Sequence, residues 1–119
     1  RVLWLRNMHV SDITPLQHLK KLRILDLERT NVSNLAPLKT LRDLRYLDLS
    51  FTNVSDISPL KKLTNLQELW LRATDVSDLS PLKDIKKLRT LWLIDTKVPK
   101  DDETAKTLEK HGAEIHFEE

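Results

Sequence analysis

A chain of 119 residues is long enough to fold as one domain with its own core. Its formal net charge of +2 is too small to demand a nucleic acid or an anionic membrane as partner. The absence of cysteine excludes disulfides and thiolate metal sites, and a single glycine excludes glycine-rich phosphate loops, so turns are expected to use Asp, Asn, Ser and Pro. No apolar run approaches the roughly 18 residues of a membrane-spanning helix, and no membrane insertion is predicted.

The chain opens on a strand pattern. Residues 1–5, Arg-Val-Leu-Trp-Leu, alternate as in a strand. The chain shows no basic segment followed by an apolar one, which is the pattern of a signal peptide. A domain seldom begins in the middle of a strand, so Arg1 is expected to be a cut or processed end. An N-terminal cap and a targeting signal would then lie upstream of it.

A period of 22 residues then governs the chain. Leucines recur at one position as Leu3, Leu25, Leu47, Leu69 and Leu91, and two residues later as Leu5, Leu27, Leu49, Leu71 and Leu93. Valine follows at 10, 32, 54, 76 and 98, and Pro-Leu pairs begin at 15, 37, 59 and 81. Five units in one register predict a solenoid over residues 1–98, with the first unit partial.

Each unit predicts a short strand, a turn and a helical turn. Residues 44–49 alternate apolar and polar side chains, which is typical of a half-buried strand. Thr30, Thr52, Thr74 and Thr96 follow the strands and are expected to hold the turn that leaves each strand. Ser or Thr before Pro is expected to cap a short 3-10-like helical turn, and Ala36 predicts a weaker cap in the second unit.

The repeat resembles a known family. The segment 53–60, Asn-Val-Ser-Asp-Ile-Ser-Pro-Leu, closely resembles part of the 22-residue leucine-rich repeat of bacterial internalin-type proteins, and the resemblance covers about residues 1–98. One position departs from it, because the family's asparagine after the strand is Thr in four units and Met8 in the first. The resemblance implies an α/β solenoid with a curved parallel sheet on its concave side and helical turns on its convex side. It also implies a secreted or cell-surface bacterial protein that engages a host or partner protein, although the residues alone leave a cytoplasmic location open.

The period breaks after residue 98. The acidic residues after Pro99 suit the first turn of a helix, which is expected to turn Ala105, Leu108 and Thr104 toward the last repeat and to end at Gly112. Residues 113–118 alternate again, with Ile115 and Phe117 inward. Residues 99–119 are therefore predicted to form a C-terminal capping helix and strand.

The residues between the paired leucines point out of the predicted concave face. This column contains all three tryptophans of the chain, and it reads Trp4, Asp26, Asp48, Trp70 and Trp92, with His116 as its continuation. Trp70 and Trp92 are expected to lie about 5 Å apart on adjacent strands and to stack. Asp26 and Asp48 form an acidic centre flanked by arginines at 6, 29 and 72, which suits a partner that carries Lys or Arg.

Together with the neighbouring columns, this face predicts a protein–protein interaction module. Trp, Tyr and Arg dominate the energetics of protein interfaces. The predicted partner-binding residues are Trp4, Arg6, Asp26, Glu28, Tyr46, Asp48, Phe51, Trp70, Arg72 and Trp92.

Three other interpretations stay open. The aromatic residues can simply pack on one another, in which case the chain is a structural spacer. The chain can also self-associate into a homodimer through the concave face or through the uncapped first strand. Finally, an anionic ligand can bind along the basic residues that precede the strands, which are Arg1, Arg23, Arg45, Arg89, Lys20, Lys21, Lys61, Lys62, Lys86 and Lys87. Lysines also keep a solenoid soluble, however, and the position of the aromatic residues on a different face argues against nucleic acid.

Catalysis, cofactors and metals are not predicted. Asp26 and Asp48 resemble a paired-carboxylate site, but no nucleophile or third catalytic group supports them. His111, Glu114 and His116 are expected on different elements and make a poor metal site. The chain is therefore predicted not to be an enzyme and to need no cofactor.

Overall fold

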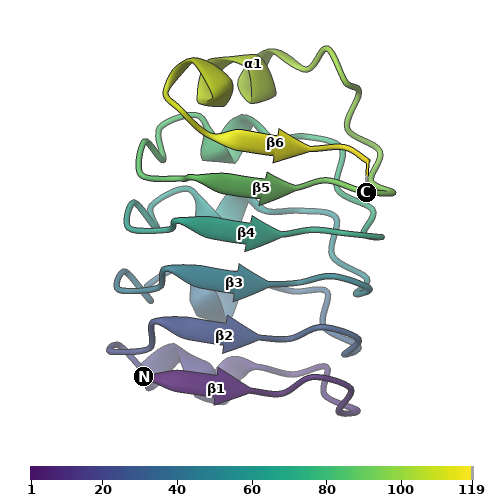
Figure 1. Cartoon of the computed structure of the whole chain (residues 1–119). Coiled ribbons are helices and arrows are strands. Elements are labelled where there is room, and N and C mark those ends of the chain that lie inside the picture. The colour runs from purple at the N-terminus through teal and green to yellow at the C-terminus, as the bar shows by residue number, and fades with distance from the viewer. Residues whose placement is uncertain (119) are drawn as a thin grey trace.

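A computed structural model describes residues 1–118 and shows one parallel sheet of six strands (Figure 1). The strands lie side by side in chain order: β1 (Val2–Trp4), β2 (Ile24–Asp26), β3 (Tyr46–Asp48), β4 (Glu68–Trp70), β5 (Thr90–Trp92) and β6 (Glu114–His116). Among the described residues, no helix is long and apolar enough to cross a membrane.

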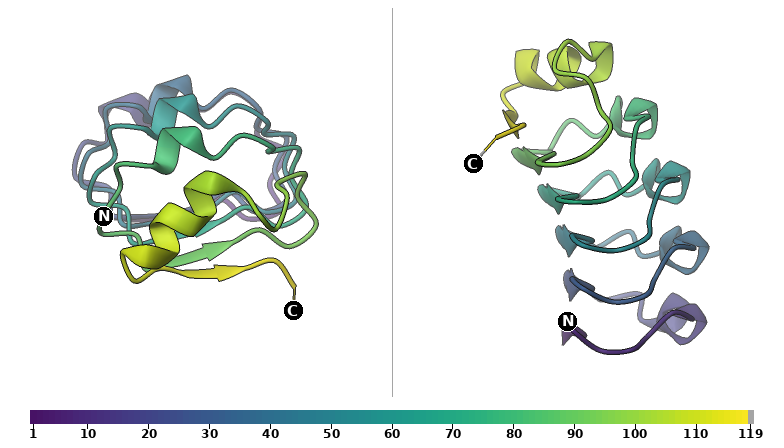
Figure 2. Two further views of the ribbon diagram at one scale, coloured as in Figure 1. Left: turned by 90° about the horizontal axis from the view of Figure 1, so that it is seen from above. Right: turned by 90° about the vertical axis from the view of Figure 1, so that its right-hand side faces the viewer.

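Short helices form the opposite side of the stack. Four 3-10 helices connect successive strands, and one α-helix precedes the last: η1 (Thr14–His18), η2 (Ala36–Leu38), η3 (Ser58–Leu60), η4 (Ser80–Leu82) and α1 (Glu103–Lys110). Figure 2 shows the sheet on the inner side of a gentle curve and the helices on its outer side. This arrangement confirms the predicted leucine-rich-repeat solenoid with a helix–strand cap.

The strand register confirms the predicted columns. Leu3 pairs with Leu25, and the same alignment continues strand by strand to Leu91 and Ile115. The column between the paired leucines therefore runs unbroken from Trp4 on β1 to His116 on β6. Because neighbouring strands lie about 4.8 Å apart, side chains of one column contact one another directly.

The core lies between the sheet and the helices. Leu47 and Leu49 of the third unit are 0% exposed, as are the leucines of the turns that pack beneath them. The corresponding Leu3 and Leu5 of the first unit are only partly buried, because β1 has a neighbouring strand on one side alone. Burial of each unit thus depends on its neighbours, as expected for a solenoid.

The threonines after the strands hold the turns as predicted. The hydroxyls of Thr30, Thr52, Thr74 and Thr96 each donate a hydrogen bond to the carbonyl oxygen three residues earlier, at 2.6–2.8 Å. Thr30, Thr52 and Thr74 are buried, so these bonds satisfy hydroxyls that would otherwise be costly to enclose. Threonine thereby stabilises the position where the family's repeat carries asparagine.

The predicted helix caps are wrong. Thr14, Ser58 and Ser80 are the first residues of their 3-10 helices, and the preceding residue at each N-cap makes no side-chain cap. A carboxylate or amide two residues earlier accepts the backbone N–H instead, and Asn34 does so for Ala36 at 2.9 Å as Asp56 does for Ser58. The second unit is therefore not weaker at this point. These hydrogen bonds hold the pKa values of Asp56 and Asp78 below their usual value.

The turn after each strand contains one residue with a left-handed backbone. At this position the prediction that Asp, Asn, Ser and Pro make the turns holds for Asn7 and Asp95, whereas Arg29, Phe51 and Ala73 occupy it in the other repeats with φ of 54–58°. The backbone N–H of this residue donates a hydrogen bond to a carbonyl oxygen of the next repeat, as from Phe51 to Arg72 at 2.8 Å. Stacking imposes this conformation on residues that disfavour it by about 1–2 kcal/mol.

Replacing Ala73 with glycine is expected to stabilise the protein by about 1 kcal/mol, because glycine adopts this backbone without strain. The matched control is Ala36→Gly in η2, where a helical backbone makes glycine destabilising by about 0.5–1 kcal/mol. Urea unfolding monitored by circular dichroism measures both changes. The same sign for both substitutions would contradict the expectation.

The C-terminal cap follows the predicted pattern. The carboxylate of Asp102 caps α1 by accepting a hydrogen bond from the backbone N–H of Ala105 at 3.0 Å. Ala105 and Leu108 are buried against the last repeat, Thr104 is half-buried, and Gly112 ends the helical segment with φ of 98°. Ile115 and Phe117 pack on the core. Glu119, the last residue of the predicted cap, lies outside the described residues, and the boundary at residue 98 stays a prediction.

Candidate protein-binding surface

The inner face of the curve contains an open hollow of about 500 Å³ over β1 to β4. Eight of the ten predicted binding residues line it, whereas Phe51 and Trp92 do not. Ile24 and Ser50 also line the hollow although they were not predicted as site residues. Ile24 shares a column with Tyr46, and Ser50 shares one with Arg72, and these shared columns are the sequence signal that identifies them. The sequence columns therefore converge on one concavity.

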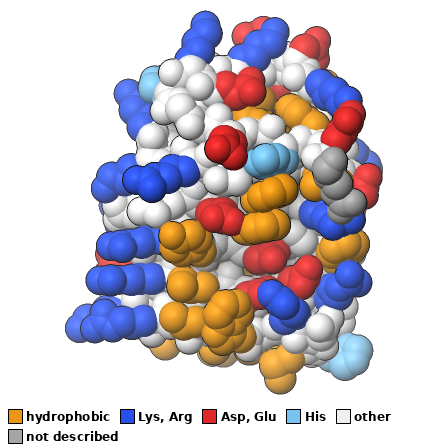
Figure 3. Space-filling model, in the orientation of Figure 1, with side chains coloured by type: hydrophobic (Ala, Val, Ile, Leu, Met, Phe, Trp, Pro, Cys, Tyr) orange, Lys and Arg blue, Asp and Glu red, His pale blue; other side chains and the backbone are white. Residues whose placement is uncertain are grey.

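Exposed apolar surface gathers at the N-terminal end of this face. Trp4 is 62% exposed, Tyr46 is 40% exposed, and Val2 lies beside them at 48%. Figure 3 shows hydrophobic side chains along the middle of the sheet face, with acidic groups beside them and Lys and Arg along the edge where the strands begin. Because these apolar groups are large and exposed, their burial by a partner would contribute favourable free energy to binding.

The aromatic residues at the C-terminal end are arranged differently. Trp70 and Trp92 stack with ring centroids 4.5 Å apart, and Trp92 stacks on His116 with centroids 4.0 Å apart, both nearly parallel. This confirms the predicted Trp pair. Because both faces of the Trp92 ring are covered, this residue stabilises the sheet face, and only Trp70 of the pair also lines the hollow.

The acidic centre is partly neutralised within the chain. The Arg6 guanidinium contacts the Asp26 carboxylate through Nη2 at 2.6 Å and through Nε at 3.0 Å, and its Nε lies 3.1 Å from Glu28. Asp26 is 2% exposed, so Arg6 compensates a charge that water cannot reach. The expected flanking role of Arg29 is wrong, because Arg29 stacks on the Phe51 ring with its Cζ 4.2 Å from the centroid.

Asp48 is the one carboxylate of this acidic group that no basic side chain of the described residues pairs with. Its Oδ1 accepts a hydrogen bond from the backbone N–H of Ser50 at 2.9 Å, and within residues 1–118 it has no ion-pair partner. Burial raises the pKa of Asp48 above its usual value of 3.8, and the nearby charges of Asp26 and Glu28 add to that rise. A cation from a partner would offset both the cost of burying this carboxylate and its repulsion by Asp26 and Glu28.

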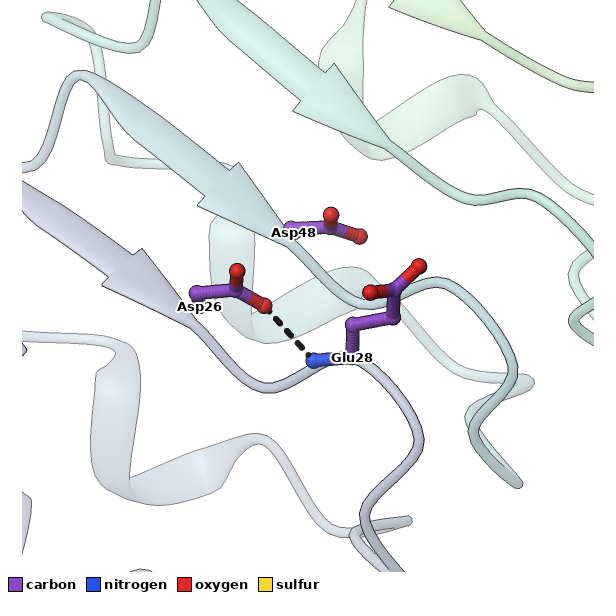
Figure 4. A group of neighbouring side chains, drawn as sticks. All are labelled: Asp26, Glu28 and Asp48. Atoms are coloured by element: carbon purple, nitrogen blue, oxygen red, sulfur yellow. Dashed lines mark hydrogen bonds between the residues drawn. The ribbon is translucent and has the colours of Figure 1, made fainter. Parts of the chain in front are cut away.

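Asp26, Glu28 and Asp48 bring carboxylate oxygens within 4.8 Å of one another (Figure 4). Such a group has the donor atoms for a metal ion. However, Arg6 already contacts two of the three carboxylates, and Asp26 also accepts the backbone N–H of Glu28 at 2.9 Å. The arrangement is explained by the guanidinium, and the absence of a metal stays a prediction.

Replacing Asp48 with asparagine is expected to stabilise the protein at neutral pH. Because the pKa of Asp48 is raised in the folded state, the free energy of unfolding of the native protein falls as the pH rises from the usual pKa of 3.8 through the raised value. Asparagine keeps the acceptor for Ser50 but carries no charge to bury. Urea unfolding of both proteins from about pH 3 to about pH 8 should show a difference that vanishes at the acid end. A variant less stable than the native chain at neutral pH would contradict the assignment.

Comparisons with known proteins agree with this geometry. The family model described as Leucine Rich repeats (2 copies) matches residues 1–40 and 42–83. An internalin of Listeria monocytogenes, InlF, is 38% identical with a TM-score of 0.80, over 85% of this chain and 30% of that one. Internalin C2 of the same organism is 29% identical with a TM-score of 0.92, over 99% of this chain and 51% of that one.

The chain thus spans less than two thirds of either internalin structure. A search of curated proteins finds no match. The family model covers more than half of the chain, and the 22-residue spacing, the parallel sheet and the 3-10 turns agree with it. The chain belongs to the leucine-rich-repeat family, and its repeats are similar to those of the two Listeria internalins.

Proposed function

We propose that the chain binds a partner protein through the concave hollow. Its family supports a protein-interaction repeat module in general terms. The observation that carries the specific proposal is the exposure of Trp4 and Tyr46 on the wall of the hollow that also holds Asp48. Trp and Tyr are among the residue types that are enriched in binding hot spots.

The chemistry of the hollow indicates what the partner presents. The aromatic wall accepts an apolar or aromatic side chain, and Asp48 with Glu28 accepts a Lys or Arg side chain. The Arg6 guanidinium supports this, because it already occupies the Asp26 side of the same acidic group with two nitrogen–oxygen contacts. A cation placed between the carboxylates and an aromatic ring gains from both.

The surface is pre-formed for binding. The stacked strands hold successive side chains of each column in register, and backbone hydrogen bonds such as Leu27 N to Asp48 O at 2.9 Å link the repeats beneath the hollow. Little backbone ordering is then required on association, which favours affinity for a given buried area.

The test is capture of a partner from extracts of the source organism and of its host cells. The double variant Trp4→Ala, Tyr46→Ala is compared with Met8→Ala, Leu19→Ala, which removes apolar groups that are 51% and 43% exposed outside the hollow. The first variant is expected to weaken binding of the captured protein at least about 30-fold, whereas the control retains it. Equal capture by both would place the binding site elsewhere.

The same samples test the alternatives. Light scattering of the native chain and of the two variants reports whether the concave face or the first strand supports a homodimer. A native dimer abolished by Trp4→Ala, Tyr46→Ala would favour self-association, and a monomer that captures nothing would favour a structural spacer. That the chain is not an enzyme stays a prediction.

A further inference from the structure

We propose that a second surface, the basic edge where the chain enters each strand, binds an extended sulfated polysaccharide. This surface comprises Arg1 and the segments 17–23, 39–45, 61–67 and 83–89. The proposal is independent of the concave hollow, because none of these residues lines it.

The arginine row of this edge is held by the backbone. Arg23 donates its N–H to the carbonyl oxygen of Arg1 at 2.8 Å, Arg45 donates to Arg23 at 2.8 Å, Gln67 to Arg45 at 2.8 Å, and Arg89 to Gln67 at 2.7 Å. Each step is one strand spacing of about 4.8 Å, so the row from Arg1 to Arg89 extends for about 20 Å. A linear ligand lying along it meets a donor side chain at the start of each strand from β1 to β5.

Charge is concentrated on this edge. The four segments hold twelve of the chain's 20 Lys and Arg and two of its 18 Asp and Glu, which are Asp43 and Asp84. All twelve basic side chains are exposed, and within residues 1–118 none forms an ion pair. A chain with a net charge of only +2 thus presents one strongly positive edge, visible as the row of blue side chains at the left of Figure 3.

Three surface hollows follow the same edge. The largest, of about 770 Å³, is lined by Lys86, Lys87 and Arg89, with Glu114 as its one acidic residue. A second, of about 420 Å³, contains Arg1, Lys20 and Lys21. A third, of about 280 Å³, lies between them and contains Lys39, Arg42, Lys61 and Lys62. The edge is therefore a succession of basic depressions and not a flat row of solvated lysines.

The chemistry of the edge favours a sulfated sugar over a nucleic acid. Proteins that bind single-stranded nucleic acids stack bases mainly on Phe, Tyr and Trp side chains, and these four segments contain none of the three. The arginine row is interrupted at Gln67, and Thr40 and Thr90 lie in the depressions. Amide and hydroxyl groups between cations match a polymer that alternates hydroxyls with oxyanions, whereas nucleic acid carries a phosphate at every nucleotide.

The experiment uses heparin as the probe and measures its affinity for the full chain from about 50 mM to about 200 mM salt. The edge variant Arg23→Glu, Arg45→Glu is compared with Lys97→Glu, Lys100→Glu, which makes the same change in net charge at the opposite ends of the strands. Arg23→Gln, Arg45→Gln supplies a milder version of the edge variant, and circular dichroism verifies the fold of each protein. The concave variant Trp4→Ala, Tyr46→Ala is measured alongside.

The edge variant is expected to bind heparin about tenfold or more weakly and with a shallower salt dependence, because at least two ionic contacts are lost. The control and the concave variant are expected to stay within about twofold of the native chain, on the same argument. If the edge variant and the control lost heparin affinity equally, net charge alone would explain the effect, and the proposal would be overturned. No heparin binding at physiological salt, or equal binding of duplex DNA of matched charge, would also overturn it.

Discussion

Replacing Leu41 with alanine is expected to lower the free energy of unfolding by about 3–5 kcal/mol. Leu41 follows η2 and is 0% exposed in the continuous core beneath the sheet. Truncation removes the apolar area and leaves a cavity that leucines of neighbouring repeats, held by their own strands, cannot fill. Because the repeats stabilise one another, damage in one unit weakens both its neighbours.

The chain supplies a matched control at the same repeat position. Leu19 is the equivalent of Leu41 one unit earlier, but it is 43% exposed. Leu19→Ala is expected to cost about 1 kcal/mol, since the side chain is already partly in water and its removal leaves no enclosed cavity. Urea unfolding followed by circular dichroism compares the two. Equal losses would show that position in the repeat, and not burial, sets the cost.

Replacing Trp92 with alanine is expected to cost about 2–4 kcal/mol of stability, through lost area and two lost stacking contacts. The ring lies between Trp70 and His116, with centroid distances of 4.5 and 4.0 Å, and thereby ties β6 to β4 across β5. The near-ultraviolet circular dichroism of the coupled indoles should fall at the same time. Hydrogen exchange should increase first in β6 and α1, which lie beyond the removed ring.

Trp4 occupies the same column and is the control. It is 62% exposed and makes no ring stack within the described chain, so Trp4→Ala is expected to change stability by less than about 0.5 kcal/mol. Its effect should appear in partner binding instead. If Trp4→Ala destabilised the protein as much as Trp92→Ala, the aromatic column would be a packing device throughout. The proposed binding surface would then lose its main support.

The separation of these two roles matters for the proposed function. The C-terminal half of the aromatic column is used to hold the last strands together, as the stack on Trp92 shows. At the N-terminal end of the sheet face, Trp4 of this column and Tyr46 of the neighbouring column are exposed to water beside the acidic hollow. A partner is therefore expected to dock over β1 to β4, with the cap outside the interface.

The sequence by itself determined the solenoid, the parallel register and the columns of side chains on the sheet. Paired leucines with a period of 22 can be buried only if every unit repeats the same path, so the period determines which residues become neighbours. Trp70 and Trp92 could be placed in contact for that reason. The threonine turns could be predicted as well, because each threonine interacts with a carbonyl three residues away.

Only the tertiary structure decided what depends on contacts between units. Whether Trp92 is covered or open depends on the rings above and below it, and the choice of Arg6 as the partner of Asp26 depends on side-chain rotamers across β1 and β2. Arg29 could have reached the acidic centre by its column, yet it stacks on Phe51. The left-handed backbone of Phe51 and Ala73 contradicts local preference, because inter-repeat hydrogen bonds outweigh a local cost of about 1–2 kcal/mol. Periodicity specifies which residues meet, but the balance of burial, charge and backbone strain among them is settled only when the units stack.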